Sequence, residues 1–289
     1  MMEKVKVLVC THKKWDIPND DIYMPLHVGK ALTEMDFGYL GDNTGDNISR
    51  KNKYYCELTG LYWGWKNMDV EYLGLCHYRR YFDFGKKLPI DCLGHHDIIM
   101  PKLNSLNMSS ANMLMNLTTR EDFHIMLMAI LKLYPDYKDT LLRCFYMENR
   151  CSLFNMLFCR KTIYDEYCRW LFSIFDEMEK WVKLSGYSRL HRLFGFLSEY
   201  LLYVYCVKNK LNILYLPTIS HPYHNKKLIG QNQFPRMISM IVKDVGFFFS
   251  HKIIHKFPIN PTNTTGFIND KIPYIDENGN VINYPNDKL

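Results

Sequence analysis

The chain has 289 residues, of which 47% are hydrophobic, 15% aromatic and 23% charged, with a formal net charge of +6 at pH 7. This composition predicts a folded globular protein and excludes a wholly disordered, collagen-like or heptad-built chain. No run of 18 apolar residues occurs and the first residues are too charged for a signal peptide, so a cytosolic location is expected. Because Lys and Arg are dispersed, the charge is consistent with attraction to anions but does not point specifically to nucleic acid, and nucleotide phosphates or anionic lipid fit equally well.

The nine cysteines are an odd number without any C-x-x-C pair. This pattern argues against a disulfide framework and against a structural zinc site. Most of the thiols are expected to be buried in a reducing compartment.

In the first third of the chain, the sequence predicts a strand that ends at polar residues, a turn-rich loop and a helix. A short β-branched run over Val5–Cys10 is typical of a buried strand, and Thr11 and His12 end it. The segment Tyr39–Ser49 is dense in Gly, Asp and Asn, which predicts a turn-rich loop that lets a ligand approach the backbone. Aromatic and small residues at helical spacing then predict a buried helix over Asn52–Lys66.

The segment Glu71–Phe82 begins as an apolar strand and ends with Arg79 and Arg80 between aromatics. In open α/β sheets ligands bind beyond the carboxyl ends of the strands, and guanidinium groups match phosphates bidentately, so we expect a diphosphate clamp here. The alternative, given even weight, is a structural salt bridge to a carboxylate such as Asp83 or Asp97.

Two further features near this strand have ordinary structural explanations. His77 and Tyr78 can donate to the same phosphate, although a lone His beside a core strand is more often a structural residue. The loop from Asp42 to Asn47 is neither a Walker A nor a G-x-G-x-x-G element, so a plain surface loop is an equal alternative. No convincing D-x-D pair for Mg²⁺ or Mn²⁺ ends a predicted strand.

The remaining elements alternate between strands and helices. A capping box over Thr118–Glu121 predicts a helix to about Tyr134. The other predicted elements are strands at His96–Lys102, Ser152–Cys159 and Asn212–Leu216, a long amphipathic helix at Ile163–Trp181 and a helix at Leu190–Asn209. This alternation predicts an α/β fold with a largely parallel sheet.

Glu199 lies on or near an apolar face of the predicted helix at 190–209. Burial there raises the pKa of a carboxyl toward the range of a general base. From spacing alone, pairing of Glu199 with Arg189 or Arg192 is the favoured alternative.

The amino-acid composition of the chain changes after Pro217. We divide it into a main domain at 1–229, an amphipathic basic segment at 230–258 and a polar tail at 259–289. The middle segment contains an F-F-F triplet at 247–249, which is more often core than membrane contact, although the neighbouring Lys and Arg residues favour an interface role. The tail is expected to be poorly ordered or loosely docked.

The strand Leu73–Phe82, with the letters LGLCHYRRYF, resembles the hallmark of a family of bacterial capsular and exopolysaccharide biosynthesis glycosyltransferases first catalogued as a domain of unknown function. Similar motifs occur in the loop at 39–49, in the C-E-L-T-G-L-Y-W run at 56–63, and at 154–156, 167–172 and 192–201. The resemblance covers roughly residues 4 to 217.

The resemblance implies a GT-A-like nucleotide-sugar fold with the donor bound over the first strands. The residues implied for the donor are Thr11, His12, Asp42, Asn47, His77, Tyr78, Arg79 and Arg80. We expect the arginines to replace the divalent metal that neutralises the diphosphate, so no metal or other cofactor is required. His221 and Lys226 are expected to close over the pyrophosphate.

The same resemblance implies that Glu199 is the catalytic base, because the G-F-L-S-E run at 195–199 matches the family, although Tyr200 stands where an arginine often follows. The expected donor is a UDP-sugar, of galactose or galactofuranose, and the expected acceptor is a lipid-linked oligosaccharide at the inner face of the plasma membrane. A non-catalytic carbohydrate-binding or scaffold protein is the first alternative. A nucleic-acid-binding protein is the second, and no RNP, helix-turn-helix or zinc signature supports it.

Overall fold

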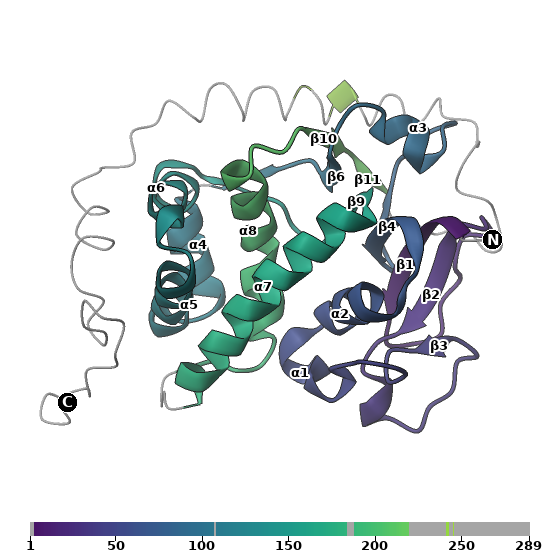
Figure 1. The fold of residues 1–289 in the computed structure, drawn as a ribbon, viewed down its shortest axis with the longest axis horizontal. Coiled ribbons are helices and arrows are strands. Elements are labelled where there is room, and N and C mark those ends of the chain that lie inside the picture. Colours follow the sequence, from purple (N-terminus) through teal and green to yellow (C-terminus); the bar gives the residue numbers. More distant parts are fainter. Residues whose placement is uncertain (1–2, 107, 184–187, 220–240, 243–244, 246–289) are drawn as a thin grey trace, which may run out of the picture.

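A computed structural model of the chain describes residues 3–106, 108–183, 188–219, 241–242 and 245 (Figure 1). The predicted segments 230–258 and 259–289 therefore lie outside the described residues, apart from three exposed positions in the first of them. His221 and Lys226 also lie outside. Over the described part, no helix combines the length and the apolar character needed to cross a membrane.

A seven-stranded sheet forms the centre of the fold, in the order β10-β6-β9-β4-β1-β2-β3. Its strands are β1 (Glu3–Thr11), β2 (Tyr23–His27), β3 (Leu40–Gly41), β4 (Val70–His77), β6 (Ile98–Pro101), β9 (Leu157–Arg160) and β10 (Ile213–Leu216). All neighbours pair in parallel except β9, which is antiparallel to both β4 and β6. The predicted α/β fold with a largely parallel sheet is confirmed.

Two small antiparallel pairs flank this sheet. Strand β5 (Tyr81–Phe82) pairs with β11 (Thr218–Ile219), and β7 (Asn104–Ser105) pairs with β8 (Arg150–Cys151). The first pair continues the chain directly beyond the carboxyl end of β4, so it borders the predicted clamp.

Helices cover the sheet, and some of them extend the domain beyond the sheet on one side (Figure 1). The helices are α1 (Asn52–Tyr55), α2 (Leu58–Asn67), α3 (Pro89–Leu93), α4 (Ser110–Leu117), α5 (Arg120–Leu133), α6 (Lys138–Leu141), α7 (Lys161–Val182) and α8 (Leu193–Lys208). Short 3-10 turns η1 (Lys30–Leu32), η2 (Ser49–Lys51) and η3 (Pro135–Tyr137) and a π-helix η4 (Leu142–Met147) connect them. Helices α4, α5 and α6 gather on the side away from β1, β2 and β3 (Figure 1).

Both faces of the sheet are buried, as the alternating residues of β1 show. Leu8 and Cys10 belong to the larger core under the helices, whereas Val7 and Val9 belong to a second core on the opposite face. Helix α2 approaches the first face closely because it has no side chain at Gly60, where a Cβ would lie 2.5 Å from the Cys10 Sγ.

Several sequence predictions need correction. The helix predicted at 52–66 is two helices in the structure. Cys56 has a positive φ of 52°, which ends α1 and separates it from α2. Of the strand predicted at 152–159, only the last three residues are in β9 (Leu157–Arg160). The N-cap of α5 is Thr119, whose Oγ1 accepts from the Asp122 N–H at 3.0 Å, whereas Thr118 bonds back to the carbonyl of Leu114 and ends α4.

Candidate functional site

The carboxyl ends of β4, β1 and β2 meet at one edge of the sheet. The register pairs Cys10 with His77 and Thr11 with His27, so the residues after β1 and β4 emerge side by side. Thr11 is buried, and its hydroxyl donates to the carbonyl of Lys13 at 2.6 Å, which turns the chain after β1. This edge brings together His12, His77 and the residues that follow them.

A tight turn follows β4, in which the Arg80 N–H donates to the His77 carbonyl at 2.8 Å. The turn directs Arg79 over the ring of Tyr78, at 5.1 Å from its centroid, and Arg80 over the ring of Phe154, at 4.0 Å. Tyr78 itself is buried and packs edge-on against His12.

Neither arginine forms an ion pair with any carboxylate in the described part of the chain. The two carboxylates weighed as structural partners have other contacts: Asp83 accepts from the Gly85 N–H, and Asp97 accepts from the Asn212 N–H. The salt-bridge alternative is therefore not formed here. Two guanidinium groups at a strand end, without an ion-pair partner among the described residues, are suited to bind an anion.

The imidazoles at this edge are held neutral. Burial and, after it, the charges of Arg79 and Arg80 lower the pKa of His77 to about 3. Partial burial, followed by the charge of Lys13, lowers the pKa of His12 as well. At pH 7 both side chains are therefore hydrogen-bonding groups rather than cations, and the positive charge of the edge comes from Lys and Arg.

Glu199 extends from α8 toward the same cluster. Burial and, after it, the charge of Glu57 raise its pKa, and the net value is about 8. A hydrogen bond from the Phe154 N–H and the charges of Arg192 and Arg80 oppose this shift without reversing it. Glu199 is thus a half-buried carboxyl whose pKa lies close to neutral pH, as a general base requires.

The pairing alternatives for Glu199 are also resolved. The backbone N–H of Arg189 donates to Asp122, and its guanidinium donates to the carbonyl of Leu117. Arg192 attracts Glu199 from a distance, but no ion pair joins the two in the described part of the structure. The catalytic role of Glu199 stays a prediction.

Sequence reasoning gave no role in the site to Glu57 or Asn155, and it considered Arg192 only as an ion-pair partner of Glu199. The Asn155 Nδ2 donates to the Glu57 Oε1 at 2.9 Å and to the Gly195 carbonyl at 3.0 Å. Arg192 has a left-handed backbone with φ of 60° at the N-cap of α8, where its N–H donates to the Lys53 carbonyl. All three lie within the motifs on which the resemblance rests, but their spacing carries no signal of its own.

The loop after β3 is organised by Asp42, which is fully buried. Its carboxylate accepts from the Gly29 N–H at 2.9 Å, from the Lys30 N–H at 3.1 Å and from the Ser49 hydroxyl. Asn47 accepts from the Ser49 N–H and donates to the carbonyl of Gly45. In this structure Asp42 shapes the loop from inside, and direct contact of Asp42 or Asn47 with a donor stays a prediction.

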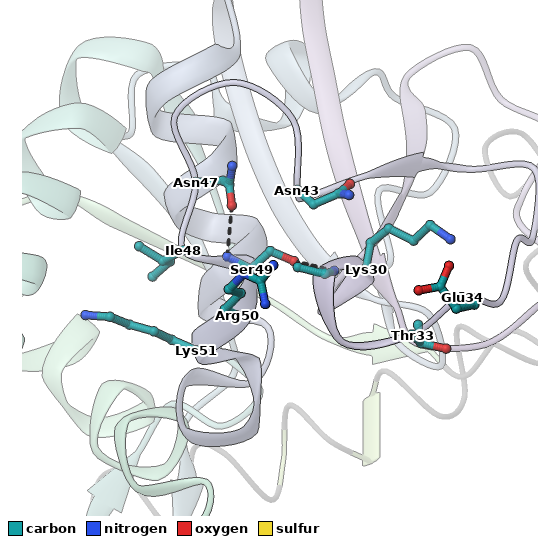
Figure 2. Close-up of a pocket in the computed structure, with 10 residues that line it drawn as sticks. Lys30, Thr33, Glu34, Asn43, Asn47, Ile48, Ser49, Arg50 and Lys51 are labelled. Atoms are coloured by element: carbon teal, nitrogen blue, oxygen red, sulfur yellow. Dashed lines mark hydrogen bonds between the residues drawn. The ribbon is translucent and has the colours of Figure 1, made fainter.

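A cavity of about 580 Å³ opens beside this loop. Figure 2 shows Lys51 on one side of it and Lys30 on the other, with Ser49 between them. Lys30, which lines the cavity, also acts on His27 at the end of β2, whose pKa is lowered by burial and, after it, by the charge of Lys30.

The residues that the structure describes include no group of three or more His, Cys, Asp or Glu side chains arranged to hold a metal ion. The positive charge near the carboxyl edge comes instead from side chains of the protein.

A mostly parallel sheet with one antiparallel strand, and with polar residues at its carboxyl edge, defines a GT-A-like α/β domain. The chain belongs to the family described as a domain of unknown function (DUF4422), whose model matches residues 6–210. Among solved structures it is similar to WbbM, a bifunctional glycosyltransferase in its apo form, with 29% identity and a TM-score of 0.71. The similarity covers 78% of this chain and 46% of that one, so the chain spans less than half of WbbM. A search of curated proteins found no match.

Proposed function

We propose that the chain is a glycosyltransferase that moves a sugar from a nucleotide-diphosphate donor to a hydroxyl group. The GT-A-like fold and the likeness to WbbM support this class of reaction. The observation that carries the proposal is the arrangement of Arg80 and Glu199. The cation is near enough to lower the pKa of the carboxyl, yet the two form no ion pair among the described residues, so both are available to a substrate.

The proposed reaction breaks the bond between the anomeric carbon and the diphosphate and forms a bond from that carbon to the acceptor oxygen. Negative charge develops on the departing diphosphate, where Arg79 and Arg80 neutralise it. The acceptor hydroxyl loses its proton to the ionised Glu199 carboxylate. In this scheme guanidinium groups take the place of a divalent metal, and turnover is independent of metal ions.

The donor is proposed to lie along the carboxyl edge. Its diphosphate contacts Arg79, Arg80 and His77, and its nucleoside extends past His12 toward the cavity at the ends of β2 and β3. We propose a UDP-sugar, with galactose or galactofuranose as the first sugars to test. These identities rest on the resemblance of the motifs.

The acceptor is proposed to be a lipid-linked oligosaccharide of capsular or exopolysaccharide synthesis, reached at the inner face of the plasma membrane. The support is the resemblance, together with the basic and aromatic sequence at 230–258. Sedimentation of the intact chain with anionic vesicles, lost at high salt, tests the membrane part.

Calorimetry and thermal shift with UDP, GDP, CMP and their sugars test the donor part, with and without EDTA. A ligand that binds only the folded protein raises its melting temperature. Stabilisation by one nucleotide diphosphate in EDTA, lost in the Arg80→Ala variant, supports the arginine clamp. Stabilisation that requires Mn²⁺ overturns metal independence, and glycan binding without donor binding favours the non-catalytic carbohydrate-binding protein.

A further inference from the structure

Two consecutive residues before β9, Phe154 and Asn155, contact both carboxyl groups of the site. Each has a left-handed backbone, with φ of 80° and 51°. The Phe154 N–H donates to Glu199, and the Asn155 side chain donates to Glu57. Residues other than glycine rarely adopt this backbone conformation, and strained backbone conformations cluster at functional sites.

The orientation of the Asn155 amide follows from its partners. The Glu57 Oε1 and the Gly195 carbonyl are both acceptors, so the NH₂ group must face them, at 2.9 and 3.0 Å. Asn155 is only 4% exposed, and its carbonyl oxygen has no partner among the described residues. The side chain is therefore committed to holding Glu57 against α8.

Helix α8 approaches Glu57 closely at Gly195, which lies one turn before Glu199. A Cβ on Gly195 would lie 3.1 Å from the Cys56 Sγ. Because Cys56 directly precedes Glu57 and Asn155 bridges Glu57 to Gly195, the turn at 154–155 gathers both carboxyl groups into one poorly solvated space.

Two carboxylates in such a space do not ionise independently, because the first negative charge opposes the second. Burial raises the pKa of Glu57, while the Asn155 hydrogen bond acts to lower it. The charge on Glu57 in turn raises the pKa of Glu199. The other titratable or charged groups that interact electrostatically with the two are Arg80, Arg192, Cys10, Cys56, Cys151 and Tyr200.

We propose that Glu57 and Glu199 form a carboxylate pair that holds one proton at neutral pH, and that Asn155 fixes the negative charge on Glu57 so that the proton resides on Glu199. Glu57 is then a positioning residue that sets the proton affinity of Glu199. The proposal rests on the proposed function only where it names Glu199 as the base. Transfer must then increase with pH as Glu199 loses its proton and becomes able to take one from the acceptor.

The pair is tested on the full-length chain by ¹³C NMR with label at the glutamate δ-carboxyl, titrated without substrate. We expect one glutamate to titrate near pH 8 in the wild type and to vanish from the spectrum in Glu199→Gln. In Glu57→Gln the same resonance should titrate at least about one pH unit lower. The control Glu71→Gln, which removes a carboxylate at the opposite end of β4, should leave it unchanged.

A glutamate midpoint that does not move in Glu57→Gln, or a wild type in which every glutamate titrates below about pH 6, overturns the pair. The variant Asn155→Gly removes the amide while keeping a residue that adopts the left-handed backbone freely. This change should raise the lower of the two titration midpoints of the pair, which the proposal assigns to Glu57. A lower midpoint that stays unchanged also contradicts the proposal. This variant serves as well if Glu57→Gln does not fold.

The titration needs no substrate, so it separates the two proposals. A chain that shows the paired midpoints but transfers no sugar removes the proposed function and leaves the pair. A chain that transfers sugar with the same pH profile in the wild type and in Glu57→Gln keeps the proposed function and removes the pair.

Discussion

Arg80 and Phe154 form a stacked pair, with the guanidinium carbon 4.0 Å from the centroid of the ring. The backbone N–H of the same Phe154 binds Glu199. One residue thus holds the cation on its side chain and the carboxyl on its backbone. The separation between the proposed phosphate-binding group and the proposed base is therefore set by the conformation of the turn at Phe154.

Replacement of Arg80 by Ala should weaken binding of a nucleotide diphosphate by roughly 10- to 100-fold, because hydrogen bonds to charged groups contribute about 1.5–3 kcal/mol each. Arg80→Lys should recover only part of the affinity, since an ammonium group cannot bind bidentately or stack. The matched control is Arg160→Ala. Arg160 also lies over a ring, that of Tyr72 at 4.8 Å, but on the opposite edge of the sheet. Equal losses in Arg80→Ala and Arg160→Ala would contradict the clamp.

Glu199→Gln should abolish transfer and change the pH dependence of stability. The pKa of Glu199 is raised to about 8 in the fold, so its contribution to stability is complete below its unfolded pKa of about 4.5 and is lost as pH rises through 8. The neutral Gln has no such loss. The free energy of unfolding of the variant should therefore gain on the wild type from pH 4.5 to 8, by up to about 1.4 kcal/mol per pH unit.

Urea denaturation at several pH values measures this difference. A gap between wild type and Glu199→Gln that stays constant from pH 4.5 to 8 would show that Glu199 has an ordinary pKa. In that case burial does not raise the pKa of Glu199 toward the value that a general base needs.

The strongly periodic parts of the fold were predictable from the sequence. Helix α7 is confirmed because its apolar residues recur over six turns, and β1 because its β-branched run is long enough for a buried strand. Strand β2 was missed because it is short and contains Pro25, which is unusual in a central strand. Hydrophobic patterns do not encode strand direction, so the strand at β9 was predicted but its antiparallel direction was not.

Within the site, the sequence predicted the groups that one segment presents together, such as His77 to Arg80. It did not predict the pairing of Glu57 with Asn155, which are 98 residues apart in the chain. That contact depends on the left-handed backbone at Cys56, Phe154 and Asn155, and no glycine marks these positions. Tertiary packing selects the conformation, so local sequence carries no sign of it.

Glu177 on α7 provides the opposite case to Glu199. Burial acts to raise its pKa, but hydrogen bonds from Lys132, Lys180 and Trp181 outweigh this and lower it to about 2. Its stabilising contribution is therefore present above pH 4.5 and lost as pH falls through 2. Because both lysines are partly exposed, we expect Glu177→Gln to lose about 1–3 kcal/mol at pH 7.

Thermal unfolding between pH 2 and 7 tests this, and the difference between wild type and Glu177→Gln should shrink toward pH 2. The control is Glu166→Gln, on the exposed face of the same helix, which should stay within about 0.5 kcal/mol of the wild type. A difference that persists unchanged at pH 2 would show that Glu177 acts through packing rather than through its charge.

Asp42 should control both the stability of the loop and the affinity for the nucleoside. Asp42→Ala leaves the Gly29 and Lys30 amides and the Ser49 hydroxyl without their acceptor, at a cost of roughly 3 kcal/mol. Since Lys30 and Ser49 also line the cavity, nucleotide affinity should fall in proportion to the lost order of the loop. Asp46→Ala is the matched control, because Asp46 is 59% exposed, and it should change stability by less than about 0.5 kcal/mol. An Asp42→Ala protein with native stability and no nucleotide binding would instead make Asp42 a direct ligand of the donor.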